Sequence, residues 1–121
     1  MSKVKITERG WAGHFICSNR CRFRRNTLLE YQDKKVVVSS VGLMENSDGT
    51  GFEPISINRC FETMCWYADL EDTRYYDIDV EKQIYFDSPW CINEMDADDK
   101  ANVMHDNVVK EIANKLISGK I

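Results

Sequence analysis

The stretch Asn26–Gly42, NTLLEYQDKKVVVSSVG, indicates a β-hairpin and decides the fold class. Lys35–Gly42 is the clearest run of β-branched residues in the chain, a composition typical of strands. Asn26–Tyr31 is a second, mixed apolar segment, and the polar residues Gln32–Lys34 between the two favour a turn. We therefore expect two antiparallel strands joined by a short connection.

Shorter segments on both sides of this hairpin also have strand character. The further expected strands are Ala12–Ser18, Glu53–Ile57, Arg59–Ala68 and Lys82–Asp87. Ser88-Pro89 ends the last of them, because proline cannot donate to a sheet ladder. We expect loops at Glu45–Gly51 and Asp69–Arg74, which are rich in turn-forming or acidic residues.

The spacing of apolar residues changes after Lys100 and predicts a helix. The apolar stripe consists of Ala101, Met104, Val108, Ile112 and Leu116, at steps of three or four residues. The acidic residues 96–99 suit the start of a helix, and Gly119 suits its end. A second apolar flank, Val103, Val109 and Ile117, fits either a broad face against the sheet or contact with a second subunit.

These elements predict one α+β domain over residues 1–121. The expected architecture is an antiparallel β-meander of five to seven strands with a C-terminal α-helix, and the helix is expected to mediate assembly into a dimer or higher homo-oligomer. No signal peptide or membrane span is recognisable in the sequence, and five cysteines without an export signal suggest free thiols in a reducing cytoplasm. Cysteine and histidine spacing is poor for zinc, so we expect no metal and no cofactor.

The net charge of −4 excludes a generally basic protein that coats nucleic acid. The charge is unevenly distributed, because residues 1–60 carry +4 and residues 61–121 carry −8. Much of the positive charge lies in Arg20–Thr27, RCRFRRNT, where four arginines occupy six positions. In a strand, Arg20, Arg22 and Arg24 would share one face, and Phe23 and Arg25 the other.

Arginine forks match phosphate oxygens, so this cluster suits a phosphorylated ligand. The alternative is that the arginines are solvated or paired with the carboxylates of the second half. Aromatic residues between Phe61 and Trp90, with Arg59 beside them, could stack a base or could simply fill the core. Catalysis is poorly supported: no nucleophile signature is present, and we expect His105 at the helix surface or an interface.

Four segments together resemble a family of small phage proteins. They are GHFICSNRCRFRRNTLL (13–29), RCFETMCWYAD (59–69), FDSPW (86–90) and KANVMHDNVVKEI (100–112). This order is similar to that of the Thoeris anti-defence sponge proteins, which counter bacterial TIR-based immunity. The resemblance implies a β-sheet with a C-terminal helix, assembled as dimers or higher oligomers with ligand at subunit interfaces.

The resemblance also implies a non-enzymatic function in the cytoplasm of the infected bacterium. Such proteins sequester glycocyclic ADP-ribose signals without cleaving them, and some are thought to hold cyclic oligonucleotides at a separate site. The residues chosen for ligand binding on their chemistry lie in the matching motifs or, for one asparagine, in the loop after FDSPW. They are Arg22, Arg24, Arg25, Asn26, Thr27, Arg59, Phe61, Trp66, Trp90, Asn93 and Lys110. We expect no membrane and no stable nucleic-acid partner.

Two other functions are compatible with the residues alone. The first is a phage inhibitor acting by protein–protein contact, such as an anti-CRISPR protein, whose acidic half mimics nucleic-acid phosphate. The second is a small nucleic-acid-binding protein that uses the RCRFRR segment, which the overall acidic charge disfavours.

Overall fold

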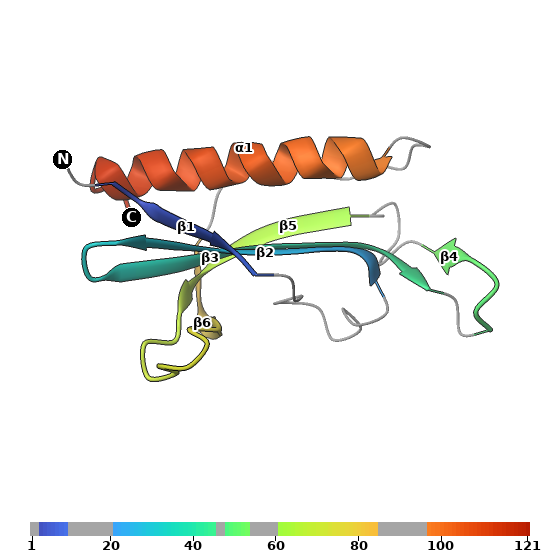
Figure 1. Cartoon of the computed structure of the whole chain (residues 1–121), viewed down its shortest axis with the longest axis horizontal. Coiled ribbons are helices and arrows are strands. Elements are labelled where there is room, and N and C mark those ends of the chain that lie inside the picture. The colour runs from blue at the N-terminus through green and yellow to red at the C-terminus, as the bar shows by residue number, and fades with distance from the viewer. Residues whose placement is uncertain (1–2, 10–20, 46–47, 54–60, 85–96) are drawn as a thin grey trace.

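The described residues form one antiparallel sheet with a long helix on one of its faces (Figure 1). The computed structural model describes residues 3–9, 21–45, 48–53, 61–84 and 97–121. Its elements are β1 (Lys5–Glu8), β2 (Cys21–Tyr31), β3 (Lys34–Glu45), β4 (Phe52–Glu53), β5 (Phe61–Ala68), β6 (Ile78–Ile84) and α1 (Ala97–Ile117). The strand order is β1-β2-β3-β5-β6, and the two-residue β4 pairs with the far end of β3.

The β2–β3 hairpin is the centre of the sheet. Tyr31 pairs with Lys34 across a two-residue connection, and the register continues without a break to Arg24 opposite Val41. Gln32 in this connection has φ of +56°, a left-handed conformation that a residue with a side chain adopts at some cost. Because β3 is paired on both sides and covered on both faces, Val36, Val37 and Val38 are all fully buried, which explains the unbroken apolar run.

The main core lies between α1 and the sheet. Side chains that alternate along the central strands form one side of it, and the helix supplies the stripe that faces them. The buried members are Leu29, Val36, Val38, Cys65, Ile84, Val108, Val109, Ile112 and Leu116. A smaller cluster of Leu28, Val37 and Ala68 involves the alternate side chains and packs against Tyr76 and Ile78. The 69–77 turn lies across the sheet from the helix in Figure 1.

The α+β fold expected from the sequence is confirmed, with differences in detail: β2 begins at Cys21 rather than at Asn26, and β3 extends to Glu45 rather than ending at Gly42. β1 was missed, because its four residues are all exposed and show no apolar alternation. β6 begins at Ile78 rather than at Lys82, and α1 begins at Ala97, before Lys100. The expected strand Ala12–Ser18 lies outside the described residues, as do 54–57 of the next one and 85–87 of the last.

The helix end and the second apolar flank of the helix are also resolved. α1 ends at Ile117, and Gly119 has the left-handed φ of +73° that glycine tolerates best. Val109 is buried in the core, whereas Val103 and Ile117 are exposed. Assembly through the helix stays a prediction.

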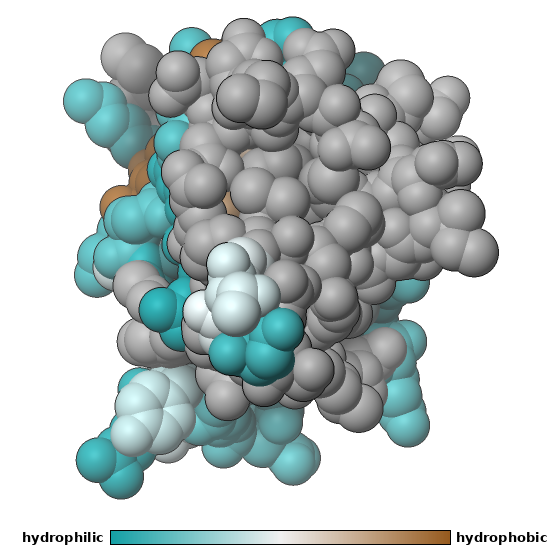
Figure 2. Space-filling model, turned by 90° about the vertical axis from the view of Figure 1, so that its right-hand side faces the viewer, coloured by the Kyte–Doolittle hydropathy of each residue, from teal (hydrophilic) through white to brown (hydrophobic). Residues whose placement is uncertain are grey.

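On the face shown in Figure 2, the described surface is predominantly polar. In the view of Figure 2 most of the coloured atoms are hydrophilic, and hydrophobic residues occupy only small areas. Within the described part of the chain, no helix has both the length and the apolar character needed to cross a membrane.

Replacing the central core residue of the helix should test this packing. Ile112 is fully buried, so Ile112→Ala should reduce the free energy of unfolding by about 2–5 kcal/mol through lost burial and the cavity left behind. Denaturant unfolding monitored by circular dichroism measures this change. The matched variant Val103→Ala, at a 59% exposed helix position, should change stability by no more than about 0.5 kcal/mol. Equal effects of the two substitutions would contradict the packing.

Candidate functional site

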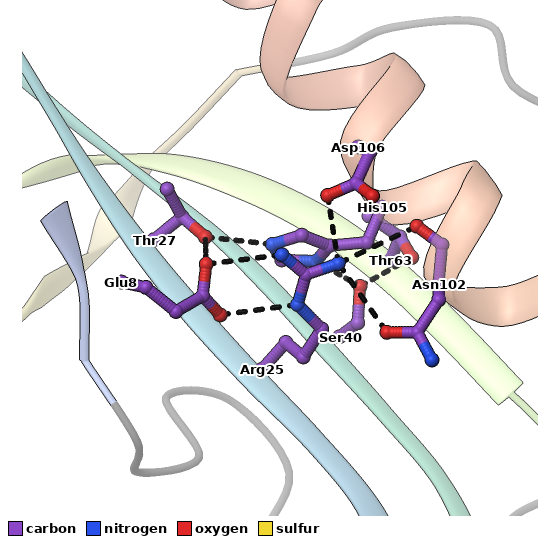
Figure 3. Close-up of polar contacts among 8 residues, drawn as sticks. All are labelled: Glu8, Arg25, Thr27, Ser40, Thr63, Asn102, His105 and Asp106. Atoms are coloured by element: carbon purple, nitrogen blue, oxygen red, sulfur yellow. Dashed lines mark hydrogen bonds and ion pairs between the residues drawn. The ribbon is translucent and has the colours of Figure 1, made fainter. Parts of the chain in front are cut away.

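The most developed polar arrangement is a chain of hydrogen bonds that runs through His105 between helix and sheet (Figure 3). The His105 Nδ1 atom lies 2.6 Å from Ser40 Oγ, and Nε2 lies 2.8 Å from Thr27 Oγ1. Ser40 Oγ is in turn 2.6 Å from Thr63 Oγ1. Thr27 Oγ1 donates to Glu8 Oε2 at 2.8 Å. The imidazole of His105 on α1 is therefore connected by hydrogen bonds to β2, β3 and β5, and through Thr27 to β1.

The strand register explains how these side chains meet. Arg25, Ser40 and Thr63 pair directly across β2, β3 and β5, and so form one row under the helix. Glu8 and Thr27 pair across β1 and β2 in the neighbouring row. Because opposite residues in paired strands point to the same face, the polar groups of both rows converge on His105.

The ionised Glu8 carboxylate fixes the direction of every hydrogen bond in the chain. A carboxylate only accepts, so the single Thr27 hydroxyl proton goes to Glu8. Thr27 must then accept from His105 Nε2–H, which leaves Nδ1 of a neutral imidazole as an acceptor for the Ser40 hydroxyl. Ser40 has no second proton, so Thr63 donates to Ser40. Thr27 and Ser40 therefore each donate one hydrogen bond and accept one, and Thr63 donates one at the end of the chain.

Burial and neighbouring charges keep His105 neutral. Its side chain is fully buried, and burial together with the nearby positive charge of Arg25 lowers the pKa of His105 to about 4, although Glu8 and Asp106 oppose this shift. Glu8 has the opposite balance: burial raises its pKa, but hydrogen bonds from Arg25 and Thr27 outweigh burial and hold the pKa below its usual value. The pair thus consists of a neutral imidazole and an ionised carboxylate.

Arg25 connects the hydrogen-bond chain to the exposed helix residues Asp106 and Asn102. Its Nε and Nη2 atoms donate to the two Glu8 oxygens, both at 3.0 Å, and its Nη1 lies 2.8 Å from an Asp106 oxygen. Nη1 also donates to the main-chain and side-chain oxygens of Asn102 at 3.4 Å. One guanidinium therefore links β1, β2 and α1, with its fork used as a bidentate donor to the carboxylate.

Arg9, a buried arginine, directly follows the end of β1. Arg9 Nε donates to Asn26 Oδ1 at 2.8 Å, and the Arg9 main-chain N–H donates to the Asn26 carbonyl at 2.7 Å. Arg9 Nη1 donates to the carbonyl oxygens of Tyr75 and Tyr76. Arg9 therefore holds the 69–77 turn against β2.

The reactive groups of the described residues are sealed inside the fold. Ser40, His105 and Cys65 are each 0% exposed, and burial raises the pKa of the Cys65 thiol, which disfavours a reactive thiolate. A substrate in solvent cannot reach the Ser40–His105 pair while α1 is docked. Nowhere in the described ranges do three or more His, Cys, Asp or Glu side chains gather to hold a metal ion.

The residues expected to bind ligand fall into three groups: those that are buried or engaged in internal contacts, those that are exposed, and those whose side chains lie outside the described part. Arg25, Asn26 and Thr27 are engaged in the internal contacts above, and Trp66 is buried. Arg24 and Lys110 are exposed. Arg22 and Phe61 lie in β2 and β5, but their side chains are outside the described part, as are Arg59, Trp90 and Asn93 entirely. Ligand contact by any of these residues stays a prediction.

The expectation of a surface or interface position for His105 is wrong. His105 follows Met104, and the sheet-facing side of the helix is broad enough to include both residues. The His105 side chain points into the sheet. Sequence reasoning also missed Glu8, Ser40 and Thr63. The available signal was a hydroxyl residue within each of three expected strand segments, at Thr27, Ser40 and Thr63.

Neither a protein-family model, nor a curated protein, nor a solved structure matches this chain. The similarity of its motifs to the Thoeris anti-defence sponge proteins therefore stays a prediction.

The neutral His105 should make stability depend on pH in a defined window. Its pKa is about 4 in the folded state and about 6.5 when unfolded, so its contribution is complete above pH 6.5 and is lost as pH falls toward 4. The loss should approach about 3 kcal/mol. Denaturant unfolding at several pH values measures it. His105→Gln, which keeps His14, should remove this slope, and an equal slope in both proteins would contradict the assignment.

Arg25 and Arg24 should differ in their effect on stability. Arg25→Ala leaves Glu8 and Asp106 without their cation, and we expect a loss of about 1–2 kcal/mol, because both carboxylates are partly solvated. Arg24→Ala removes an exposed side chain and should change stability by less than about 0.5 kcal/mol. Thermal unfolding in low and high salt measures both. The Arg25 effect should shrink in high salt, and a salt-independent loss would contradict the ionic explanation.

Proposed function

We propose that this protein binds and sequesters a cyclic nucleotide immune signal without cleaving it. The proposed ligand class is glycocyclic ADP-ribose, with cyclic oligonucleotides as a further class, and the proposed setting is the cytoplasm of an infected bacterium. The observation that carries the proposal is the exposure of Arg24 within the arginine-rich motif while the chain's described Ser–His pair is sealed. A ligand in solvent can therefore reach the guanidinium of Arg24, whereas it cannot reach the Ser40–His105 pair.

The fold is the one that the motif resemblance leads us to expect. An antiparallel sheet carries the arginine motif on β2, and the C-terminal motif forms α1. Shared architecture supports the proposal only weakly, since one fold can serve many functions. The stronger support is that two motifs separated by some 80 residues meet through Arg25 and Asp106 in a single ionic contact.

Strand alternation assigns different tasks to neighbouring arginines. Arg25 points to the helix side, where Glu8 and Asp106 neutralise it. Arg24 points to the other side and is exposed, and Arg22 occupies the equivalent alternating position two residues earlier in β2. Arg24 can therefore contact a phosphate without breaking an internal ion pair, whereas Arg25 cannot.

Sequestration needs tight binding and no chemistry. Such binding depends on contacts already in place before the ligand arrives. The Glu8–Arg25–Asp106 contact and the His105 chain hold β2 rigidly against its neighbours and α1, which suits this requirement. The acidic remainder of the chain would discourage binding of bulk nucleic acid.

Recovery of ligand from the intact protein tests this proposal. The protein is incubated with glycocyclic ADP-ribose isomers and cyclic di- and trinucleotides, washed, denatured, and the released material is identified by mass spectrometry. We expect an intact cyclic nucleotide. A degraded product would indicate an enzyme, and no retained ligand would contradict sequestration and favour a protein–protein inhibitor.

A matched pair of variants makes the test specific. Arg24→Ala should reduce ligand retention at least severalfold with an unchanged melting temperature. Arg74→Ala, which removes an exposed arginine from the 69–77 turn, should retain ligand like the parent protein. Equal retention by both variants would show that Arg24 takes no part in binding.

A further inference from the structure

A cavity of about 280 Å³ opens at the turn end of the β2–β3 hairpin. Three lysines line it, Lys34, Lys35 and Lys82, and an apolar wall is formed by Tyr67, Ala68 and Leu70. Asp33, on the exposed hairpin connection, is the single carboxylate of the lining. The cavity therefore has a cationic part and an apolar part, and the carboxylates of Glu30 and Asp79 lie near two of its lysines.

The sheet register brings these residues together from distant parts of the chain. Lys34 and Lys35 begin β3, beside Val36, which pairs with Tyr67 at the end of β5. Lys82 comes from β6, the next strand across, where β5 and β6 pair through a bulge. None of these residues belongs to the arginine motif, and none contacts the His105 chain among the hydrogen bonds above.

The lysines are held in place but not saturated. Lys34 Nζ donates to the Ile121 carbonyl at 2.5 Å, Lys35 Nζ lies 3.5 Å from Glu30, and Lys82 Nζ lies 3.8 Å from Asp79. Lys35 also lies 4.6 Å from the centre of the Tyr76 ring. An ammonium group has three donors, so these single partners leave donors for an anion that offers several oxygens.

The apolar wall of the cavity favours a ligand that carries an apolar ring in addition to its anionic group. Leu70 is 55% exposed although it is a large aliphatic residue, and it lines the cavity beside the half-buried Tyr67. A flat ring placed against these two side chains would cover surface that water now covers. The volume lies just below the usual range for small-molecule sites, roughly 300–1,000 Å³, which suits a ligand no larger than a mononucleotide.

We propose that this cavity, the lysine pocket, binds a small organic phosphate whose apolar ring lies against Tyr67 and Leu70 and whose phosphate meets Lys34 and Lys82. The site is separate from Arg24 and does not rest on the proposed sequestration function. It also selects against long polyanions, because the adjoining hollow is lined by Asp69, Glu71, Asp79 and Glu81. A strand of nucleic acid would run from the lysines into these carboxylates.

Titration with three probes tests the lysine pocket. Adenosine 5′-monophosphate, adenosine and inorganic phosphate are added separately to the isotope-labelled full chain, and backbone amide resonances are followed by NMR. The monophosphate should shift the Lys35, Tyr67 and Leu70 amides with saturation, and bind at least tenfold more tightly than either fragment. No saturating shift at these amides, or equal binding of the three probes, would overturn the proposal.

Charge variants separate the pocket from general attraction. Lys82→Gln should weaken monophosphate binding about fivefold to tenfold, the effect of losing one charge-assisted contact near the surface. Lys3→Gln, which removes an exposed lysine outside the pocket, should leave binding unchanged. Equal weakening by the two variants would overturn the site.

Arg24→Ala should bind the monophosphate like the parent protein. The two proposals can therefore fail independently. Monophosphate binding by Lys82→Gln tests the lysine pocket, and retention of the cyclic nucleotide by Arg24→Ala tests sequestration.

Discussion

A buried imidazole must have both of its ring nitrogens satisfied, and this requirement organises the interface between α1 and the sheet. His105 is fully enclosed, and an unmet nitrogen at such a position would destabilise the fold by about 1–3 kcal/mol. Thr27 and Ser40 meet the requirement from two neighbouring strands. Because His105 can reach both Thr27 and Ser40 from only one position of the helix along the sheet, these contacts also fix that position.

The contacts of Arg25 extend this constraint to the sheet edge. β1 is short and fully exposed, and it carries none of the main core's buried side chains. Its Glu8 nevertheless ends the hydrogen-bond chain and holds Arg25 in a bidentate contact, while Arg25 reaches Asp106 on the helix. A cation that sequence reasoning assigned to a ligand thus has a structural partner on each side. Under the proposed function, recognition of a ligand would fall instead to exposed cations such as Arg24.

Sequence reasoning predicted the features that depend on local periodicity. The KVVVSSVG run is recognisable by its β-branched composition and the Ala101–Leu116 stripe by its period, so the hairpin and the helix could be recognised without tertiary information. β1 has no such period, and the polar chain depends on register: Arg25, Ser40 and Thr63 meet only because three distant segments pair. The lysine pocket likewise joins β3, β5 and β6. Residues 10–20, 54–60 and 85–96, which hold several expected ligand contacts, lie outside the described residues.

The central claim is that His105 is a neutral structural group whose proton lies on Nε2, rather than a catalytic base. Nitrogen-15 NMR of the histidine side chains at pH 7 tests this claim most directly. The account predicts a protonated Nε2 and an unprotonated Nδ1 for His105, assigned by its loss in His105→Gln, with no change of state down to pH 5. A proton on Nδ1, exchange between the two tautomers, or a doubly protonated ring at pH 6 would contradict the account.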